Sequence, residues 1–326
     1  MTTSYKQRGV IQPIARRIRA YFAPVVRSGP APSVFDPAKN AAFSLDSPPA
    51  PWVDAGWMQN FARTSATKIV TVNAGTSGAT QSQFRNTINA QVEFEFTAWG
   101  KLQMALSSGS QHMNLLAEAA NASNAPSGSA PLMPTATLPG STASEIVVGA
   151  GAVNTFAVGD IIAVDSDYAQ QTGYVGSGVA GAYVKNPASV LFDSNYIRRV
   201  TFNVGRVAAN TLTTLLLAQP LIGGAPPANA QVQKVIGFVD REGGSFFQEW
   251  SALFIALSET GARVFYHYPR LQPAHAATET ASAIADSFNA WSLHASFIAL
   301  PTQDANDGEQ VLCYRSYVPA LSAALY

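Results

Sequence analysis

Charged residues are scarce in this sequence. Only 12% of its 326 residues are Asp, Glu, Lys or Arg, against roughly a quarter in an average soluble domain, while hydrophobic residues make up 47%. The 20 basic and 20 acidic residues cancel, so composition gives no electrostatic footprint for nucleic acid or an anionic membrane. A chain with little charge repulsion between its copies tends to associate, which makes self-assembly a natural hypothesis.

Cysteine is nearly absent. Cys313 is the single cysteine, which excludes an intrachain disulfide framework and a cysteine-rich zinc site. We expect it to pack in a strand as a small apolar residue. No two of the four histidines have the H-x-x-x-H spacing, so no metal-hydrolase site is predicted. These histidines are His112, His267, His275 and His294.

Long apolar runs are also missing. No segment approaches the roughly twenty apolar residues of a membrane span, and the basic N-terminus is not followed by a secretory signal. We therefore expect a soluble protein made in the cytoplasm, with no membrane partner. No repeat of 20 to 50 residues is evident, which sets aside solenoids and propellers.

The stretch 89–107 carries the clearest local pattern. Four apolar residues from Val92 to Ala98 alternate with polar ones, which is the period of a strand with one buried side. Trp99–Gly100 interrupts the alternation, and apolar residues then recur at three- and four-residue spacing across Leu102–Leu106. A strand, a corner and a short amphipathic helix are predicted.

Glu93 and Glu95 share the polar side of this predicted strand. Paired carboxylates can act as general acid and base when their pKa values separate. No pattern supplies a substrate pocket beside them, and the sequence has no nucleophile elbow or phosphate-binding loop. We interpret the glutamates as a solvated or subunit-facing surface, and we predict a structural protein without catalytic residues or cofactor rather than an enzyme.

The first 51 residues have the composition of an N-terminal arm. Pro13 opens a basic segment, I-A-R-R-I-R-A-Y-F, whose spacing predicts an amphipathic helix of a few turns. The seven prolines from 24 to 51 exclude a longer helix or a central strand. We expect the arm 1–51 to be extended, with docking onto another subunit favoured over a membrane-surface role.

The rest of the chain divides into a mainly β core and an insertion. Residues 52–143 and 241–326 are predicted to form the core, a β-sandwich or barrel with short helices, and 144–240 a small inserted β-barrel domain. Loops are predicted at 75–83 and 117–142. Further core strands are predicted at Lys68 to Asn73, Phe246 to Leu257, Arg263 to Leu271, Ser292 to Leu300 and Gln310 to Val318, with a hairpin turn at Asp307–Gly308. Predicted strands of the insertion are Glu145 to Val148, Asp160 to Asp165, Ser189 to Asp193, Arg198 to Val204, Thr211 to Leu217 and Gln231 to Asp240.

Two motifs of the insertion invite a ligand interpretation. Gly176–Gly181 matches G-x-G-x-x-G but lacks the βαβ context of a dinucleotide site, so we interpret it as a flexible loop. Asp165 and Asp167 could offer carboxylates to calcium or magnesium, yet a complete site needs more ligands. With Asp160 they stand at turn positions, where Asx-turn hydrogen bonds explain them, and no metal site is predicted.

Several of these patterns together resemble the tail tube proteins of tailed bacteriophages. The resemblance covers residues 52–116 and 244–318. It is carried, in chain order, by W-V-D-A-G-W at 52–57, the strand at 68–72, the Gly75/Gly78 loop, V-E-F-E-F-T-A-W-G-K-L-Q-M-A-L at 92–106 and the C-terminal strands from 246 to 318. The Pro-rich arm and the insertion depart from a minimal tube subunit.

The resemblance implies a virion protein assembled in the host cytoplasm. Six subunits would form a ring whose sheets join into one barrel, and rings would stack into a tube through which DNA passes without specific binding. Partners would be further copies of the chain and tape-measure, sheath or terminator proteins. Glu93 and Glu95 would line the lumen, where negative charge repels DNA phosphates.

Two other classes stay open. A capsid or decoration protein is one, although a major capsid protein would carry a long spine helix that the sequence lacks. A carbohydrate-binding or hydrolytic β-sandwich is the other, and it would expose aromatic residues such as Trp250, Tyr266 and Tyr268 on one sheet face. Packing of these rings in a core or interface is favoured.

Overall fold

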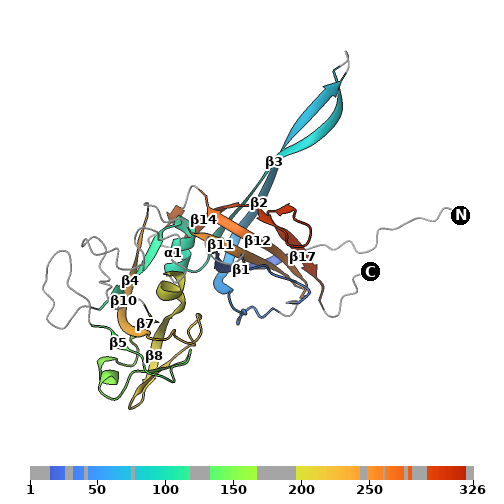
Figure 1. Ribbon diagram of the computed structural model, residues 1–326. Helices are drawn as coiled ribbons and strands as arrows, with labels where there is room; N and C mark the ends of the chain where they lie inside the picture. The colour runs from blue at the N-terminus through green and yellow to red at the C-terminus, as the bar shows by residue number, and fades with distance from the viewer. Residues whose placement is uncertain are drawn as a thin grey trace, which may run out of the picture. The chain divides into compact units, whose positions relative to one another are not determined.

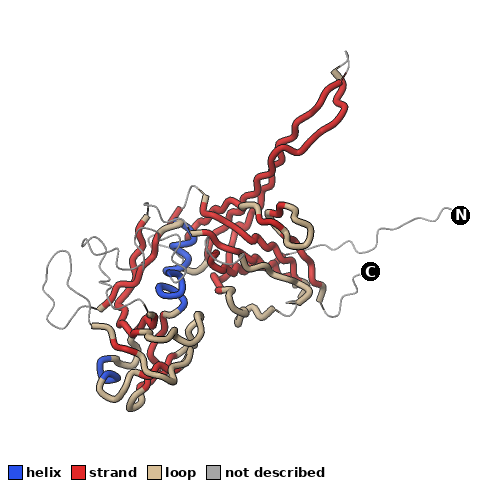
Figure 2. Tube along the Cα trace, in the orientation of Figure 1, coloured by secondary structure: helices blue, strands red, loops and turns tan. Residues whose placement is uncertain are grey.

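The computed structural model describes residues 15–25, 32–39, 43–74, 78–117, 133–166, 196–242, 248–259, 261–274, 278–280 and 292–320, and it is mainly β-structure (Figures 1 and 2). These residues form two compact units. Unit 1 lies within Met1–Val25, Ala31–Ser108 and Gln248–Tyr326, and the described residues of unit 2 lie within Gly109–Phe247. The mainly β fold class is as predicted, but residues 109–143 group with unit 2 rather than with the core predicted at 52–143.

Unit 1 is built on an eight-stranded antiparallel sheet in the order β13-β14-β3-β2-β1-β11-β12-β17. β12 also pairs with β14, through Leu271–Pro273 and Phe297–Ala299, so the six strands from β14 to β12 close into a ring. The elements are β1 (Ala15–Val25), β2 (Val53–Ala74), β3 (Ala79–Phe96), α1 (Lys101–Ser108), β11 (Glu249–Ser258), β12 (Arg263–Pro273), β13 (Thr278–Thr280), β14 (Ser292–Ala299), β15 (Thr302–Gln303), β16 (Gln310–Val311) and β17 (Tyr314–Val318).

An aromatic cluster fills the interior of this ring. Phe22 of β1 is fully buried, and its ring centroid lies 5.7 Å from Phe297 of β14 and 5.9 Å from Phe254 of β11. Phe94 of β3 stacks on Phe297 at 5.9 Å. Such ring pairs stabilise the core beyond their buried area, so four strands far apart in sequence are held to one another.

The strand and helix predicted within 89–107 are confirmed. Val92, Phe94 and Phe96 are buried, as the alternation requires, and α1 follows with Leu102 and Leu106 buried. The predicted loop 75–83 is too long, since β3 already begins at Ala79. Its polar sequence gave no strand pattern because both sides of β3 are exposed there.

The predicted N-terminal helix is wrong, because residues 15–25 form strand β1. This strand pairs with β11 from Ala15 to Val25 and with β2 from Ile18 to Phe22. Tyr21 and Phe22 point to opposite sides and both are fully buried. A strand buried on both sides has no period-2 pattern, so the sequence could not reveal it.

Part of the predicted arm packs on the other side of β1. Phe35 stacks on Phe265 of β12 at 5.0 Å, and Phe43 meets Tyr21 edge-on at 4.9 Å. Trp52 completes this cluster. The described residues between 32 and 52 contain no helix or strand, as their prolines predict, yet they cover a face of the chain's own sheet.

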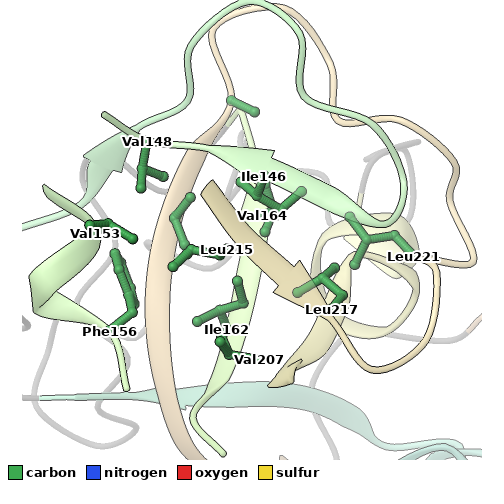
Figure 3. Close-up of a cluster of buried hydrophobic side chains, with 12 residues drawn as sticks. Ile146, Val148, Val153, Phe156, Ile162, Val164, Val207, Leu215, Leu217 and Leu221 are labelled. Carbon is green, nitrogen blue, oxygen red and sulfur yellow. The ribbon is translucent and has the colours of Figure 1, made fainter. Parts of the chain in front are cut away.

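Unit 2 has a seven-stranded antiparallel sheet, in the order β4-β10-β7-β8-β9-β6 with β5 beside β10. Its core is a cluster of aliphatic side chains with Phe156, drawn in Figure 3, where residues of β6, β7, β8 and β9 point into one interior. The elements are β4 (Gln111–Leu116), β5 (Thr135–Ala136), β6 (Glu145–Val147), the 3-10 helix Ala152–Thr155, β7 (Ile161–Asp165), the π-helix Arg198–Phe202, β8 (Val204–Asn210), β9 (Thr214–Leu217) and β10 (Gln231–Arg241).

The strand predicted at 198–204 is wrong for its first five residues. The backbone N–H of Asn203 donates to Arg198 O, a π-type bond that brings residues five apart together. Both side chains then reach the buried carboxylate of Asp165, Arg198 with two bonds of 2.9 Å and Asn203 with one of 3.1 Å. A strand would point positions 198 and 203 to opposite sides.

The predicted strands 145–148, 160–165 and 231–240 are confirmed to within a residue, and 189–193 lies outside the described residues. The strand predicted from Thr211 begins only at Thr214, because 211–213 form the turn after β8, and β8 was predicted only at Val204. β4 was not predicted. It pairs with β10 from Val235 to Arg241, and it falls where only the end of a helix and the start of a loop were expected. Residues 167–195, with Asp167 and the Gly176–Gly181 motif, lie outside the described residues.

Candidate assembly surface

The β2–β3 hairpin extends well beyond the closed part of the unit 1 sheet (Figures 1 and 2). β1 pairs with β2 only at Val53–Met58, and β14 pairs with β3 only at Gln91–Phe96. Among the described strands, residues 59–74 of β2 pair only with β3, and residues 79–90 of β3 pair only with β2; these two segments are here called the ribbon. A two-stranded ribbon is marginally stable in water by itself, so packing against another surface would stabilise this one.

Apolar side chains are exposed on both faces of the ribbon. Opposed residues of antiparallel strands share a face, and successive residues alternate. One face carries Ile69 and Ile88, and the other carries Val70, Val72 and Phe84. Their exposed fractions range from 40% for Ile88 to 59% for Phe84. Neither face is covered by the chain's own described residues.

The ribbon contains basic residues and no acidic one. Arg63, Lys68 and Arg85 are its only charged residues. Arg63 lies near the root, where its Nε donates to the Tyr268 hydroxyl at 2.9 Å. Lys68 and Arg85 are exposed farther out, and neither makes an ion pair with a described residue. The outer ribbon is therefore a positively charged surface in a chain of zero net charge.

Glu93 and Glu95 lie at the root of the ribbon, on the side of β3 opposite its buried phenylalanines. Both are half-buried. Gln91 Nε2 donates to Glu93 Oε1 and, at 3.0 Å, to Ser296 Oγ. The structure places the two carboxylates side by side on a polar strip of β3, as predicted.

The remaining predicted polar sites have structural partners. Asp160 accepts from Lys234 Nζ and from the Ala157 N–H, both at 2.8 Å, and these bonds lower its pKa against the opposing effect of burial. Asp165 is held by Arg198 as described above. Among the described residues, no group of three or more His, Cys, Asp or Glu side chains could hold a metal ion.

The histidines fall in different places. His112 is buried in unit 2, with its Nε2 2.6 Å from Thr201 Oγ1. His267 is buried in unit 1, His294 lies on β14, and His275 is outside the described residues. Cys313 is half-buried between β16 and β17 rather than within a strand, and burial raises its pKa.

The aromatic residues considered for carbohydrate binding are mostly internal. Trp250 and Tyr268 are almost completely buried, and Tyr266 packs against Phe61 at 5.5 Å. The three rings do not form an exposed platform on one sheet face. Their packing confirms the interpretation of these rings as core residues.

No protein-family model matches the chain. No curated protein matches it either. Its function must therefore be argued from its own residues. Among the described residues, no helix has the length and apolar character required to cross a membrane.

The exposed apolar residues of the ribbon were not singled out in the sequence. They stand among Thr, Ser, Asn and Gln, and the two faces share them, so no amphipathic period marks them. One signal was available: from residue 59 to 92 the chain has three basic and no acidic residues. A segment of this length whose charged residues are all basic is uncommon in a chain whose charges otherwise balance.

Proposed function

We propose that this chain is a structural subunit that assembles with copies of itself, as a tail tube protein of a tailed bacteriophage does. The subunits form hexameric rings, and the rings stack into a tube that conducts DNA. The chain has no catalytic role in this proposal, and its partners are other copies and the proteins at the ends and on the outside of the tube.

The observation that carries the proposal is the uncovered ribbon. Its outer strand edges have no partner strand among the described residues, and its outer apolar side chains, from Ile69 to Ile88, are exposed. Exposed strand edges readily pair with other chains. The low charge of the whole sequence also favours self-assembly, because the copies repel one another only weakly. Both features suit a subunit that is stable as part of an array.

In this proposal Glu93 and Glu95 face the channel. They are adjacent on a polar strip of β3, and a carboxylate wall repels the phosphates of passing DNA, which keeps the DNA from binding to the wall. A density map of the assembled tube tests this directly. Side chains of Glu93 and Glu95 pointing away from the lumen would remove their proposed role without affecting the assembly.

The experiment that tests the function is imaging of the purified full chain. Negative-stain electron microscopy and sedimentation velocity over a hundredfold range of protein concentration are expected to show rings that convert to tubes. Closed shells would indicate a capsid or decoration protein. A monomer across the whole concentration range would contradict self-assembly.

A further inference from the structure

The ribbon is suited to contact with other molecules on both of its faces rather than on one face alone. Ile69 and Ile88 are exposed on one face, and Val70 and Phe84 on the other. A hairpin that lay on a single partner surface would leave one of these faces in water. Coverage of both faces requires a cleft, or the junction between two neighbouring molecules.

The mixed character of both faces argues against lipid as the occupant. Lys68 shares a face with Val70, and Arg85 shares a face with Ile69. A strand in contact with hydrocarbon needs one face without charge, because a basic residue there is costly. A protein surface that offers both apolar area and carboxylates matches the ribbon better.

The chain itself carries a matching acidic element, the turn between β15 and β16. Asp304, Asp307 and Glu309 lie within six residues, and no Lys or Arg occurs from residue 292 to 314. Asp307 and Glu309 are exposed. Neither makes an ion pair with a described residue. The turn thus presents two carboxylates that no described basic residue pairs with.

Hydrogen bonds fix the shape of this turn. Asp304 Oδ1 accepts from the Asn306 N–H at 2.8 Å, and Asp307 Oδ1 accepts from the Glu309 N–H at 3.0 Å. Gly308 takes the positive φ of +78° that the turn requires. The Tyr314 hydroxyl donates to Asp304 Oδ2 at 2.6 Å and holds the pKa of Asp304 below its usual range. The carboxylates are therefore presented on a preformed scaffold.

Four other acidic residues of unit 1 already have a basic partner. Asp46 and Asp54 bind Arg19, and Glu249 binds Arg270 at 2.8 Å. Asp36 lies 3.6 Å from Lys39. The β15–β16 turn differs from these four in presenting exposed carboxylates that make no ion pair with a described residue, so it can receive cations from another molecule.

We propose that the ribbon of one copy docks between neighbouring copies of this chain, with Lys68 on one face and Arg85 on the other, each against the acidic turn, Asp307 and Glu309, of a neighbouring copy. The inference rests on the proposed self-assembly and names the two surfaces that meet. Ribbon and turn are different elements, so the contact is heterologous, and heterologous contacts generate rings or open stacks rather than closed two-fold dimers. This is the type of contact that a ringed tube requires.

Charge exchange between the two surfaces tests the proposal. One variant carries Lys68→Glu and Arg85→Glu, and a second carries Asp307→Asn and Glu309→Lys. Asn at 307 keeps an oxygen acceptor for the Glu309 N–H, so the turn can still form. A third variant combines all four changes. Sedimentation velocity gives the protein concentration at which half of each variant is assembled.

We expect each double variant to raise this concentration by about tenfold or more, because like charges then face each other across the contact. The combined variant is expected to recover most of the loss. Added salt should weaken assembly of the wild type, since exposed charges are screened within roughly 8 Å at physiological ionic strength. Loss without recovery in the combined variant, or no loss in either double variant, would overturn the pairing.

A matched control is available in unit 2. Glu145 and Glu242 are exposed there, and replacing both with Lys changes the net charge at least as strongly as either double variant without altering either surface. This control should assemble like the wild type, and circular dichroism should show that every variant is folded. A wild type that stays monomeric would contradict the proposed function itself. Binding of the wild type to DNA or to anionic vesicles through Lys68 and Arg85, with assembly unaffected, would contradict docking on a second copy.

Discussion

At the scale of single residues, His267 joins the segment after β1 to the sheet. Its Nε2 accepts from the Phe35 N–H at 3.2 Å, so its proton must be on Nδ1, which then donates to Ala252 O at 3.2 Å. The ring lies between Trp52 and Tyr314, at centroid distances of 5.7 and 6.0 Å. A second proton on Nε2 would face an N–H group in a buried site, which disfavours the charged form.

The pH dependence of stability follows from this arrangement. Burial lowers the pKa of His267 to about 4, from 6.5 in the unfolded chain, and the bond to Ala252 opposes the shift only in part. The unfolded chain then binds a proton before the folded protein does. Stability is therefore complete above pH 6.5 and falls as the pH decreases towards 4, by an amount approaching roughly 3 kcal/mol.

Urea unfolding at a series of pH values checks this prediction, with His267→Gln as the reference. The variant should be less stable at pH 7, and the difference in unfolding free energy between it and the wild type should shrink from pH 6.5 to pH 4. Carboxylate titration affects both proteins and cancels in the difference. A difference that stays constant over this range would show that His267 does not titrate as described.

At the scale of elements, the β2–β3 hairpin divides into a folded root and an outer ribbon. Phe94 and Phe96 near the root are fully buried, whereas Phe84 and Ile69 farther out are about half exposed. The root therefore contributes to the stability of unit 1, because burial of apolar area is the main favourable term in folding. The outer ribbon contributes little, since its side chains lose little contact with water.

Shortening the hairpin separates these two roles. Ala66 is opposite Asn89, so replacing residues 67–88 with Asn-Gly closes the strands with a two-residue turn. We expect the free energy of unfolding to change by less than about 1 kcal/mol, because the described side chains that are removed are exposed, apart from the half-buried Ser82. The shortened chain should remain folded and fail to assemble. Normal tubes from it would mean that assembly uses another surface.

At the scale of the whole molecule, the chain has two separate cores. The aromatic cluster of Phe22, Phe94 and Phe254 belongs to unit 1, while the cluster around Ile146, Ile162 and Leu215 belongs to unit 2. The second cluster is almost entirely aliphatic (Figure 3). Separate cores allow each unit to open and close with its own free energy.

A single core substitution tests that independence. Leu215 is fully buried, and Leu215→Ala should cost about 2–5 kcal/mol through the cavity it leaves. Hydrogen exchange is expected to rise across β7 to β10 of unit 2, while the protected amides of β3 and β11 in unit 1 remain as in the wild type. An equal rise in both units would show that the chain unfolds as one cooperative body.

Much of the fold was predictable where one side of a strand is buried and the other is not. The alternation from Val92 to Phe96 fixed both the strand and its buried side. The Asp307–Gly308 turn is present, but it joins β15 to β16 rather than the predicted strands 292–300 and 310–318. β1 was missed because both of its sides are buried. The π-helix at 198–202 was missed because it is stabilised by hydrogen bonds to the carboxylate of Asp165, thirty-three residues earlier in the chain.

The candidate site was less predictable than the fold. Glu93 and Glu95 stood out because an alternating strand flanks them, but the ribbon beyond them did not. The ribbon is a candidate site because few other segments of the chain pack against it, and packing is a property of the folded chain rather than of the local sequence. Only the pairing of β1 with residues 53–58 of β2 and of β14 with residues 91–96 of β3 shows where coverage ends.

The sequence by itself determined the β class, the low charge and the local strand and turn patterns, because these depend on residues close together in the chain. The tertiary structure decided that β1 lies within the sheet, that the sheet closes through β12 and β14, and that residues 59–74 and 79–90 pair with no described strand other than each other's, β2 and β3. These features depend on which distant segments pair, and pairing is set by the combined burial and hydrogen bonding of the whole unit rather than by any one segment.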